Sequence, residues 1–142
     1  MRKAFFVLSL IAAFSAQAQK PLVWEVLGMT TYTNNFEGVE GGQTIPNFPP
    51  VLVTQFEGEE VAISGYLIPI DVSANTYALS KNPFTSCFFC GNAGPETVIE
   101  LRFDKSPGRF ATDTFTMIKG ILQLNRDGNG LFFTLKHASL HG

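Results

Sequence analysis

Apolar and polar residues alternate most regularly between positions 60 and 70 of the chain. Val61, Ile63 and Leu67 fall on one side of this stretch and alternate with residues such as Ser64 and Tyr66. A period of two is typical of a β-strand. Runs rich in β-branched and aromatic residues predict four more strands, over residues 76–80, 97–103, 115–124 and 131–137. We therefore expect an all-β protein with five core strands.

Two of these strands carry a glycine at their centre, in the related patterns ISGYL at residues 63–67 and IKGIL at residues 118–122. A central glycine weakens a strand unless sharp coiling requires it, and strands coil sharply in a small closed barrel. Gly65 and Gly120 therefore favour a small five-stranded OB-like barrel over residues 57–142. An open antiparallel sheet or a sandwich is the alternative that the pattern leaves open.

The last two strands are separated by Gly128, Asn129 and Gly130. These residues adopt positive φ angles readily, so they predict a tight hairpin. The segment superficially resembles a calcium loop, but Lys136 occupies the position at which such a loop requires a bidentate acid. The hairpin is the better interpretation.

The chain contains 14 phenylalanines, and those in or beside strands are expected in the core. These core candidates are Phe103, Phe110, Phe115, Phe132 and Phe133. Phe84, Phe88 and Phe89 lie instead in a predicted loop, where exposed aromatic residues indicate a contact surface.

The first 18 residues have the features of a secretory signal. Arg2 and Lys3 precede an apolar run over residues 4–14, and Ala16-Gln17-Ala18 forms a small-x-small cleavage site. The run is shorter than the roughly 20 residues that cross a bilayer, and no later segment predicts a membrane span. We expect a signal peptide over residues 1–18, an irregular N-terminal lead over residues 19–56, and a protein that is periplasmic or secreted.

Charge argues against a nucleic-acid partner. Without the signal, eight basic residues face twelve acidic ones, which gives a net charge of about −4. The basic residues are scattered singly along the chain, whereas proteins that bind nucleic acids cluster them to neutralise phosphates.

The candidate chemistry lies in Cys87 and Cys90, the only cysteines of the chain, which are followed by Gly91. Two thiolates from one tight turn suit a metal knuckle, and zinc is the natural ion for a site of four soft or borderline ligands. Glu96 and His137 are candidates for the missing ligands, and His141 lies at a familiar ligand spacing from His137. A homodimer could instead contribute two knuckles and give a four-sulfur site.

These residues also have plainer interpretations. Glu96 could simply cap the strand that follows it, and His137 could simply end the last strand. The cysteine pair could form a disulfide, because export favours oxidation, although so short a loop gains little stability from closure. It could also perform thiol–disulfide exchange, but the residues after Cys90 do not predict the helix whose N-terminus would stabilise a thiolate.

Four segments together resemble an uncharacterised family of small exported bacterial proteins, a domain of unknown function. They are VAISGYLIP at residues 61–69, LSKNP at 79–83, SCFFCG at 86–91 and GPE at 94–96. The likeness covers roughly residues 57–138. It implies an OB-like barrel with a periplasmic binding or accessory role, and some relatives belong to envelope metal-uptake systems.

The resemblance marks Cys87, Cys90, Gly94, Pro95 and Glu96 as the functional positions. Relatives in other lineages carry Cys-x-His in place of the cysteine pair, an exchange that preserves metal affinity but removes the dithiol. The hypothesis is therefore a zinc-binding domain with a binding or accessory role rather than an established enzyme activity, and with an envelope protein or metal-uptake component as partner. A thiol–disulfide redox protein and a structural disulfide in an interaction module remain the alternatives.

Overall fold

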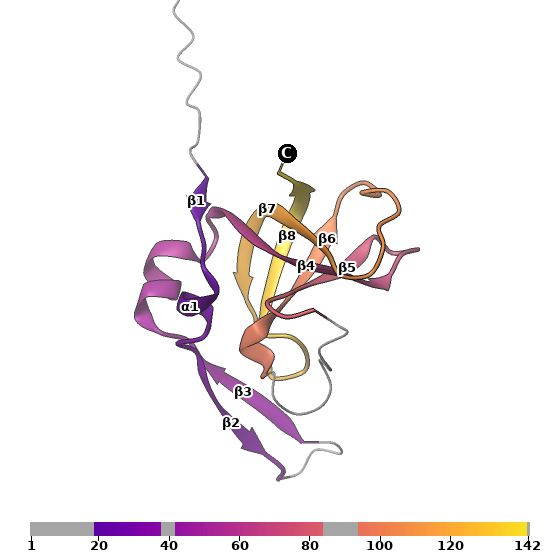
Figure 1. Cartoon of the computed structure of the whole chain (residues 1–142). Coiled ribbons are helices and arrows are strands. Elements are labelled where there is room, and N and C mark those ends of the chain that lie inside the picture. Colours follow the sequence, from indigo (N-terminus) through magenta and orange to yellow (C-terminus); the bar gives the residue numbers. More distant parts are fainter. Residues whose placement is uncertain (1–18, 38–41, 84–93, 142) are drawn as a thin grey trace, which may run out of the picture.

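Five strands close into a barrel in the computed structural model, which describes residues 19–37, 42–83 and 94–141 (Figure 1). The strands are β4 (Glu60–Asp71), β5 (Thr76–Ser80), β6 (Val98–Phe103), β7 (Thr114–Leu124) and β8 (Phe133–Leu140). They pair in the order β4-β5-β6-β8-β7, and β7 pairs back onto β4. Every pair is antiparallel except β6–β8. The barrel is the five-stranded OB-like architecture expected from the sequence.

Strand β4 belongs to both sides of the barrel, and Gly65 lies where it changes partner. Residues 60–67 pair with β7, whereas residues 66–71 pair with β5. A Cβ atom at Gly65 would lie 2.7 Å from the carbonyl oxygen of Ser80 and 2.9 Å from Cγ of Leu79. Glycine is required here because two backbones approach closely at the point of coiling.

The barrel encloses one hydrophobic core, formed by the inward side of each strand. Val61, Ile63 and Leu67 of β4 are at most 2 % exposed, which explains the alternation seen in the sequence. The core also includes the following residues: Tyr77, Leu79, Ile99, Leu101, Phe103, Ile118, Leu122, Leu124, Phe132, Phe133, Leu135 and Ala138.

The described residues of the N-terminal lead form several short elements. These are β1 (Lys20–Pro21), α1 (Trp24–Leu27), the hairpin of β2 (Thr31–Asn35) and β3 (Gln43–Asn47), and the π-helix η1 (Leu52–Phe56). Strand β1 pairs in parallel with β4, and Trp24 donates a hydrogen bond from Nε1 to the carbonyl of Ser64 at 2.7 Å. Leu22, Leu27 and Leu52 belong to the same core as the barrel. The irregular lead expected from the sequence is therefore a covering layer of short elements.

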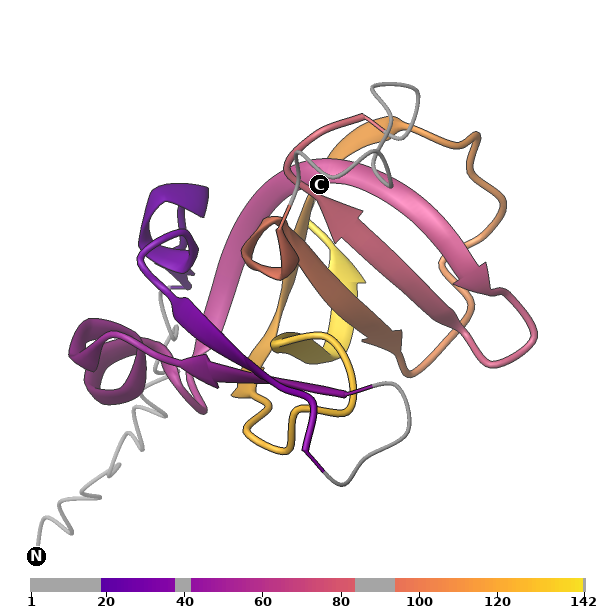
Figure 2. The same ribbon diagram turned by 90° about the horizontal axis from the view of Figure 1, so that it is seen from below.

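The β2–β3 hairpin lies against the loop that joins β7 to β8 (Figure 2). The rings of Tyr32 and Phe132 are 5.6 Å apart between centroids, and Phe48 contacts Phe132 edge-on at 6.4 Å. Gln43 donates a hydrogen bond to the side chain of Asn129 at 3.2 Å. Phe132 and Phe133 are both buried, because the hairpin and Phe48 cover the side of the loop that faces away from the barrel.

Two details differ from the sequence expectations. Phe115 is 63 % exposed and packs on Tyr66 at the barrel surface, so it is not a core residue. The β7–β8 connection spans residues 125–132, closed by a 2.8 Å hydrogen bond from the amide of Asn125 to Phe132, and is longer than a tight hairpin. Of its glycines only Gly128 has a positive φ, at 72°.

Residues 1–18, the predicted signal peptide, lie outside the described residues. Within the described part of the chain, no helix is long and apolar enough to cross a membrane.

Candidate functional site

Glu96 lies in the 3-10 helix η3 (Pro95–Thr97), one turn before β6. Pro95 suits the first helical position because its φ is fixed and it has no N–H to satisfy. Thr97 donates two hydrogen bonds to the carbonyl of Gly94, from its amide at 3.0 Å and from Oγ1 at 2.7 Å. This turn places Glu96 directly before β6 and next to α1.

The carboxylate of Glu96 folds back onto Gly94. A Cβ atom at Gly94 would overlap Oε2 of Glu96 and would lie 2.6 Å from Oε1. Oε2 is buried and has no hydrogen-bond partner among the described residues. A buried carboxylate oxygen without a partner is unfavourable, so the position suits a cation or a donor that comes from elsewhere.

Glu96 lies where the β5–β6 connection, which contains both cysteines, rejoins the barrel. Ser80 pairs with Val98, and the amide of Lys81 donates to the carbonyl of Thr97 at 2.9 Å, so the connection leaves and re-enters the barrel at one point. Cys87 and Cys90 themselves lie outside the described residues, as do Phe84, Phe88 and Phe89.

His137 occupies a β-bulge in β8. Its φ of 52° is in the left-handed region, at a register shift shared by the pairings with β6 and β7. Nδ1 lies 2.9 Å from both carboxylate oxygens of Asp104. A carboxylate on one ring nitrogen orients the other, as in many metal sites, but both side chains are about two-thirds exposed, as in ordinary surface ion pairs.

The register separates Glu96 from His137. Glu100 pairs with Thr134 in the parallel β6–β8 ladder. Glu96 lies four residues before Glu100 and His137 lies three residues after Thr134, so the two residues lie toward opposite ends of the ladder. At about 3.3 Å per residue, the two lie at least roughly 15 Å apart along the strands. The structure thus does not bring these two candidates together, and within the described residues no group of three or more His, Cys, Asp or Glu is placed to hold a metal.

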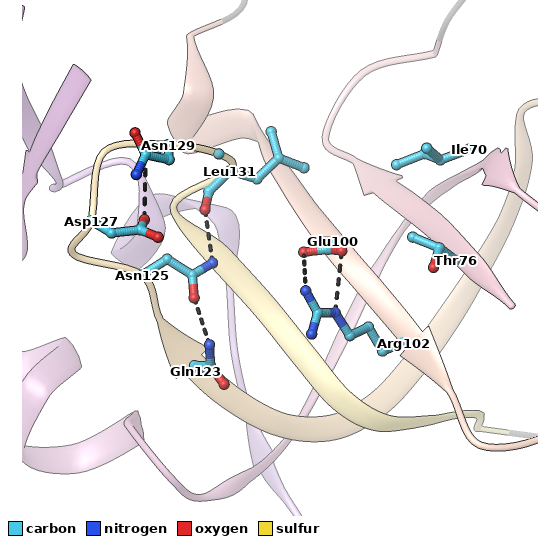
Figure 3. A pocket seen from close by; sticks show the side chains of 10 residues that line it. Ile70, Thr76, Glu100, Arg102, Gln123, Asn125, Asp127, Asn129 and Leu131 are labelled. Carbon is cyan, nitrogen blue, oxygen red and sulfur yellow. Dashed lines mark hydrogen bonds and ion pairs between the residues drawn. The ribbon is translucent and has the colours of Figure 1, made fainter. Parts of the chain in front are cut away.

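A hollow that the sequence did not reveal lies on the barrel surface between β6, the adjoining ends of β4 and β5, and the β7–β8 loop (Figure 3). Its volume is about 470 Å³. We call it the β6 cleft, defined by its lining residues Ile70, Thr76, Glu100, Arg102, Gln123, Asn125, Asp127, Asn129, Gly130 and Leu131. These residues are spread over 62 positions and form no linear motif, so only the barrel topology could have identified them.

In comparisons with known proteins, no family model, no curated protein and no solved structure matches the chain.

Proposed function

We propose that this protein is an exported binding domain that holds a transition metal ion, zinc in the first place, at the β5–β6 connection. Cys87 and Cys90 would supply two thiolates, and Glu96 would supply a carboxylate oxygen. The observation that carries the proposal is the buried, unpartnered Oε2 of Glu96, six residues after Cys90.

The chemistry of this donor set fits zinc. Zinc accepts sulfur and oxygen ligands, and binding by metal protects thiolates from oxidation in an exported protein. A cation near Oε2 would also remove the desolvation penalty of that oxygen. A fourth ligand would come from water, from an envelope partner that receives the metal, or from a second copy of the chain.

His137 has no place in this ligand set within one chain. Its distance from Glu96 along the β6–β8 ladder exceeds any metal coordination sphere. Within the same chain it would serve as a ligand only for a different ion, with Asp104 orienting its ring.

The direct test is zinc stoichiometry of the chain from residue 19 onward, purified without added metal from the periplasm of an expressing bacterium. Native mass spectrometry should show zinc bound to the folded chain, and thiol counting should find two reactive thiols only after chelation. Cys87→Ser with Cys90→Ser should abolish binding. Glu96→Gln should weaken binding by about 10- to 100-fold, because losing even a group that only supports a ligand has an effect of this size.

Glu25→Gln is the matched control, because Glu25 is an exposed acid on α1, and it should leave zinc affinity unchanged. A metal-free chain whose mass is lower by two hydrogen atoms would contain a disulfide and would end the zinc proposal. Zinc retained by the double serine variant would do the same.

A further inference from the structure

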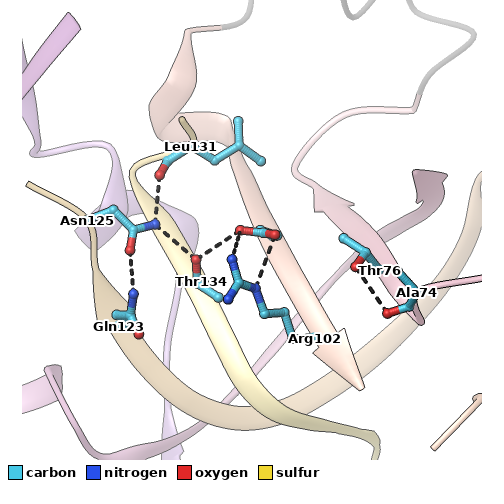
Figure 4. Close-up of polar contacts among 8 residues, drawn as sticks. Ala74, Thr76, Arg102, Gln123, Asn125, Leu131 and Thr134 are labelled. Atoms are coloured by element: carbon cyan, nitrogen blue, oxygen red, sulfur yellow. Dashed lines mark hydrogen bonds and ion pairs between the residues drawn. The ribbon is translucent and has the colours of Figure 1, made fainter. Parts of the chain in front are cut away.

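The β6 cleft carries a hydrogen-bonded chain of polar side chains across three neighbouring strands (Figure 4). Gln123 donates to Oδ1 of Asn125 at 2.7 Å, and Nδ2 of Asn125 donates to Oγ1 of Thr134 at 2.9 Å. Thr134 then donates to Oε2 of Glu100 at 3.2 Å, and the guanidinium of Arg102 contacts both oxygens of Glu100.

This network is fixed before any ligand arrives. Thr134 is 1 % exposed and anchors the chain from beneath, whereas the side chain of Arg102 is 59 % exposed and faces the cleft. Asn125 is held a second time, because Nδ2 also donates to the carbonyl of Leu131 at 2.8 Å. Polar side chains that are already held in place lose little conformational entropy when a ligand binds to them.

The charges of the cleft exclude an anionic ligand. Arg102 is the one cation in its lining, and Glu100 already neutralises it through two contacts. Asp127 adds a further negative charge. Phosphates and nucleic acids require an excess of unpaired positive charge, which this lining does not provide.

The remaining groups suit a neutral ligand with many hydroxyls. Carboxylates accept hydrogen bonds, the guanidinium donates them, and the amides of Gln123 and Asn129 do both, as hydroxyl groups also do. Ile70, 57 % exposed, and Leu131 add apolar surface for the C–H face of a ring. The volume falls in the range of about 300–1,000 Å³ typical of small-ligand sites.

The position on the fold supports the same ligand class. OB-fold barrels bind oligosaccharides and oligonucleotides on the face of their second and third strands and on the loops that join strands one to two and four to five. In this barrel those parts are β5 and β6, the β4–β5 turn and the β7–β8 loop. Residues of β5, β6 and the β7–β8 loop line the β6 cleft, together with the ends of β4 and β7.

We propose that the β6 cleft binds a neutral oligosaccharide. This site is separate from the proposed metal site and uses neither cysteine. The Cys87→Ser, Cys90→Ser variant therefore keeps saccharide binding, so failure of one proposal does not entail failure of the other.

The test is an NMR titration of the ¹⁵N-labelled chain from residue 19 onward with three neutral probes, cellotriose, maltotriose and triacetylchitotriose, at up to millimolar concentration. At least one probe should give saturable shifts in the side-chain amides of Gln123, Asn125 and Asn129. Arg102→Gln should weaken that binding by about tenfold or more, as loss of a charged hydrogen-bond donor does. Arg109→Gln, at an exposed arginine outside the cleft, should leave it unchanged.

A second matched pair guards against misfolding of the arginine variant. Ile70→Ala should weaken saccharide binding, whereas Val72→Ala should not, because Val72 is 55 % exposed but lies outside the cleft. The proposal is overturned if no probe shifts the cleft residues. It is also overturned if inorganic phosphate or a thymidine oligonucleotide binds the cleft more tightly than every saccharide.

Discussion

Arg126 donates two hydrogen bonds to the carboxylate of Glu57, from Nη2 to Oε2 at 2.6 Å and from Nη1 to Oε1 at 3.1 Å. The pair joins the β7–β8 loop to the end of the N-terminal layer. The guanidinium also lies 5.5 Å from the ring centroid of Phe48 and donates to the carbonyl of Leu124 at 3.3 Å. One side chain therefore ties the covering layer to the loop that lines the β6 cleft.

Glu57→Gln should lower the free energy of unfolding by about 0.5–1 kcal/mol, since the pair has good bidentate geometry but is half exposed. The loss should shrink in high salt, which screens exposed charges. Urea denaturation at low and high sodium chloride measures both. Glu59→Gln, at an exposed neighbouring acid, is the control, and an equal loss in both variants would contradict a specific role for the pair.

Gly65→Ala should destabilise the barrel by about 1–3 kcal/mol, the usual range for overpacking. The added methyl would meet the carbonyl of Ser80, Leu79 and the ring of Trp24, which lies 3.1 Å from the Cβ position. Gly130→Ala is the comparison, because no atom lies within 4 Å of its Cβ position. Thermal unfolding of the two variants should separate them clearly, and equal melting temperatures would argue against a close approach at Gly65.

The β4–β5 turn should make stability depend on pH through Asp71. Hydrogen bonds from Oγ of Ser73 at 2.5 Å and from the amide of Ala74 at 3.2 Å favour the carboxylate and lower the pKa of Asp71 below 3.8. A lowered pKa in the folded state stabilises the protein above the unfolded pKa of about 3.9, and this contribution is lost as the pH falls through the folded value.

The melting temperature of the wild type should therefore exceed that of Asp71→Ala by a constant amount above about pH 5, and the difference should shrink in stronger acid. Asp71→Asn keeps an acceptor oxygen without the charge, so it separates the hydrogen bond from the ionisation. A carbon-13 NMR titration of Asp71 with a midpoint at or above 3.8 would contradict the assignment.

The barrel strands were predictable because each has one buried face, whereas the covering layer gave no such signal. All five residues of β2 are exposed, so its hairpin with β3 shows no alternation of apolar and polar residues. Helix α1 has four residues, too few to display a helical period. Their positions depend on tertiary contacts such as Trp24 with Ser64 and Tyr32 with Phe132.

The candidate sites were predictable only where chemistry is local in sequence. The resemblance marks the GPE motif at residues 94–96, and the structure adds that the Glu96 carboxylate lies close to the Cβ position of Gly94. Whether Glu96 and His137 can bind the same ion depends on the register of the parallel β6–β8 pair. No local sequence pattern encodes that register. The β6 cleft was hidden for the same reason, because Glu100 meets Thr134 only through that pairing.

The GPE motif offers a way to move the Glu96 carboxylate without removing it. Gly94 has φ −78° and ψ 172°, an extended conformation that alanine adopts without strain. The new methyl of Gly94→Ala would displace only the flexible end of Glu96, so the free energy of unfolding should change by less than about 1 kcal/mol.

Zinc affinity should nevertheless fall in Gly94→Ala, as we expect for Glu96→Gln, because the new methyl would displace the carboxylate from its place over residue 94. The two changes act on one group, so the double variant should be no weaker than the weaker single variant, and their effects on the free energy of binding should not add. Competition titration with a chromophoric chelator measures all four proteins. Additive losses would mean that the carboxylate's position over Gly94 is not where Glu96 meets the metal. A Gly94→Ala chain that binds zinc as the wild type does, while Glu96→Gln does not, would mean the same.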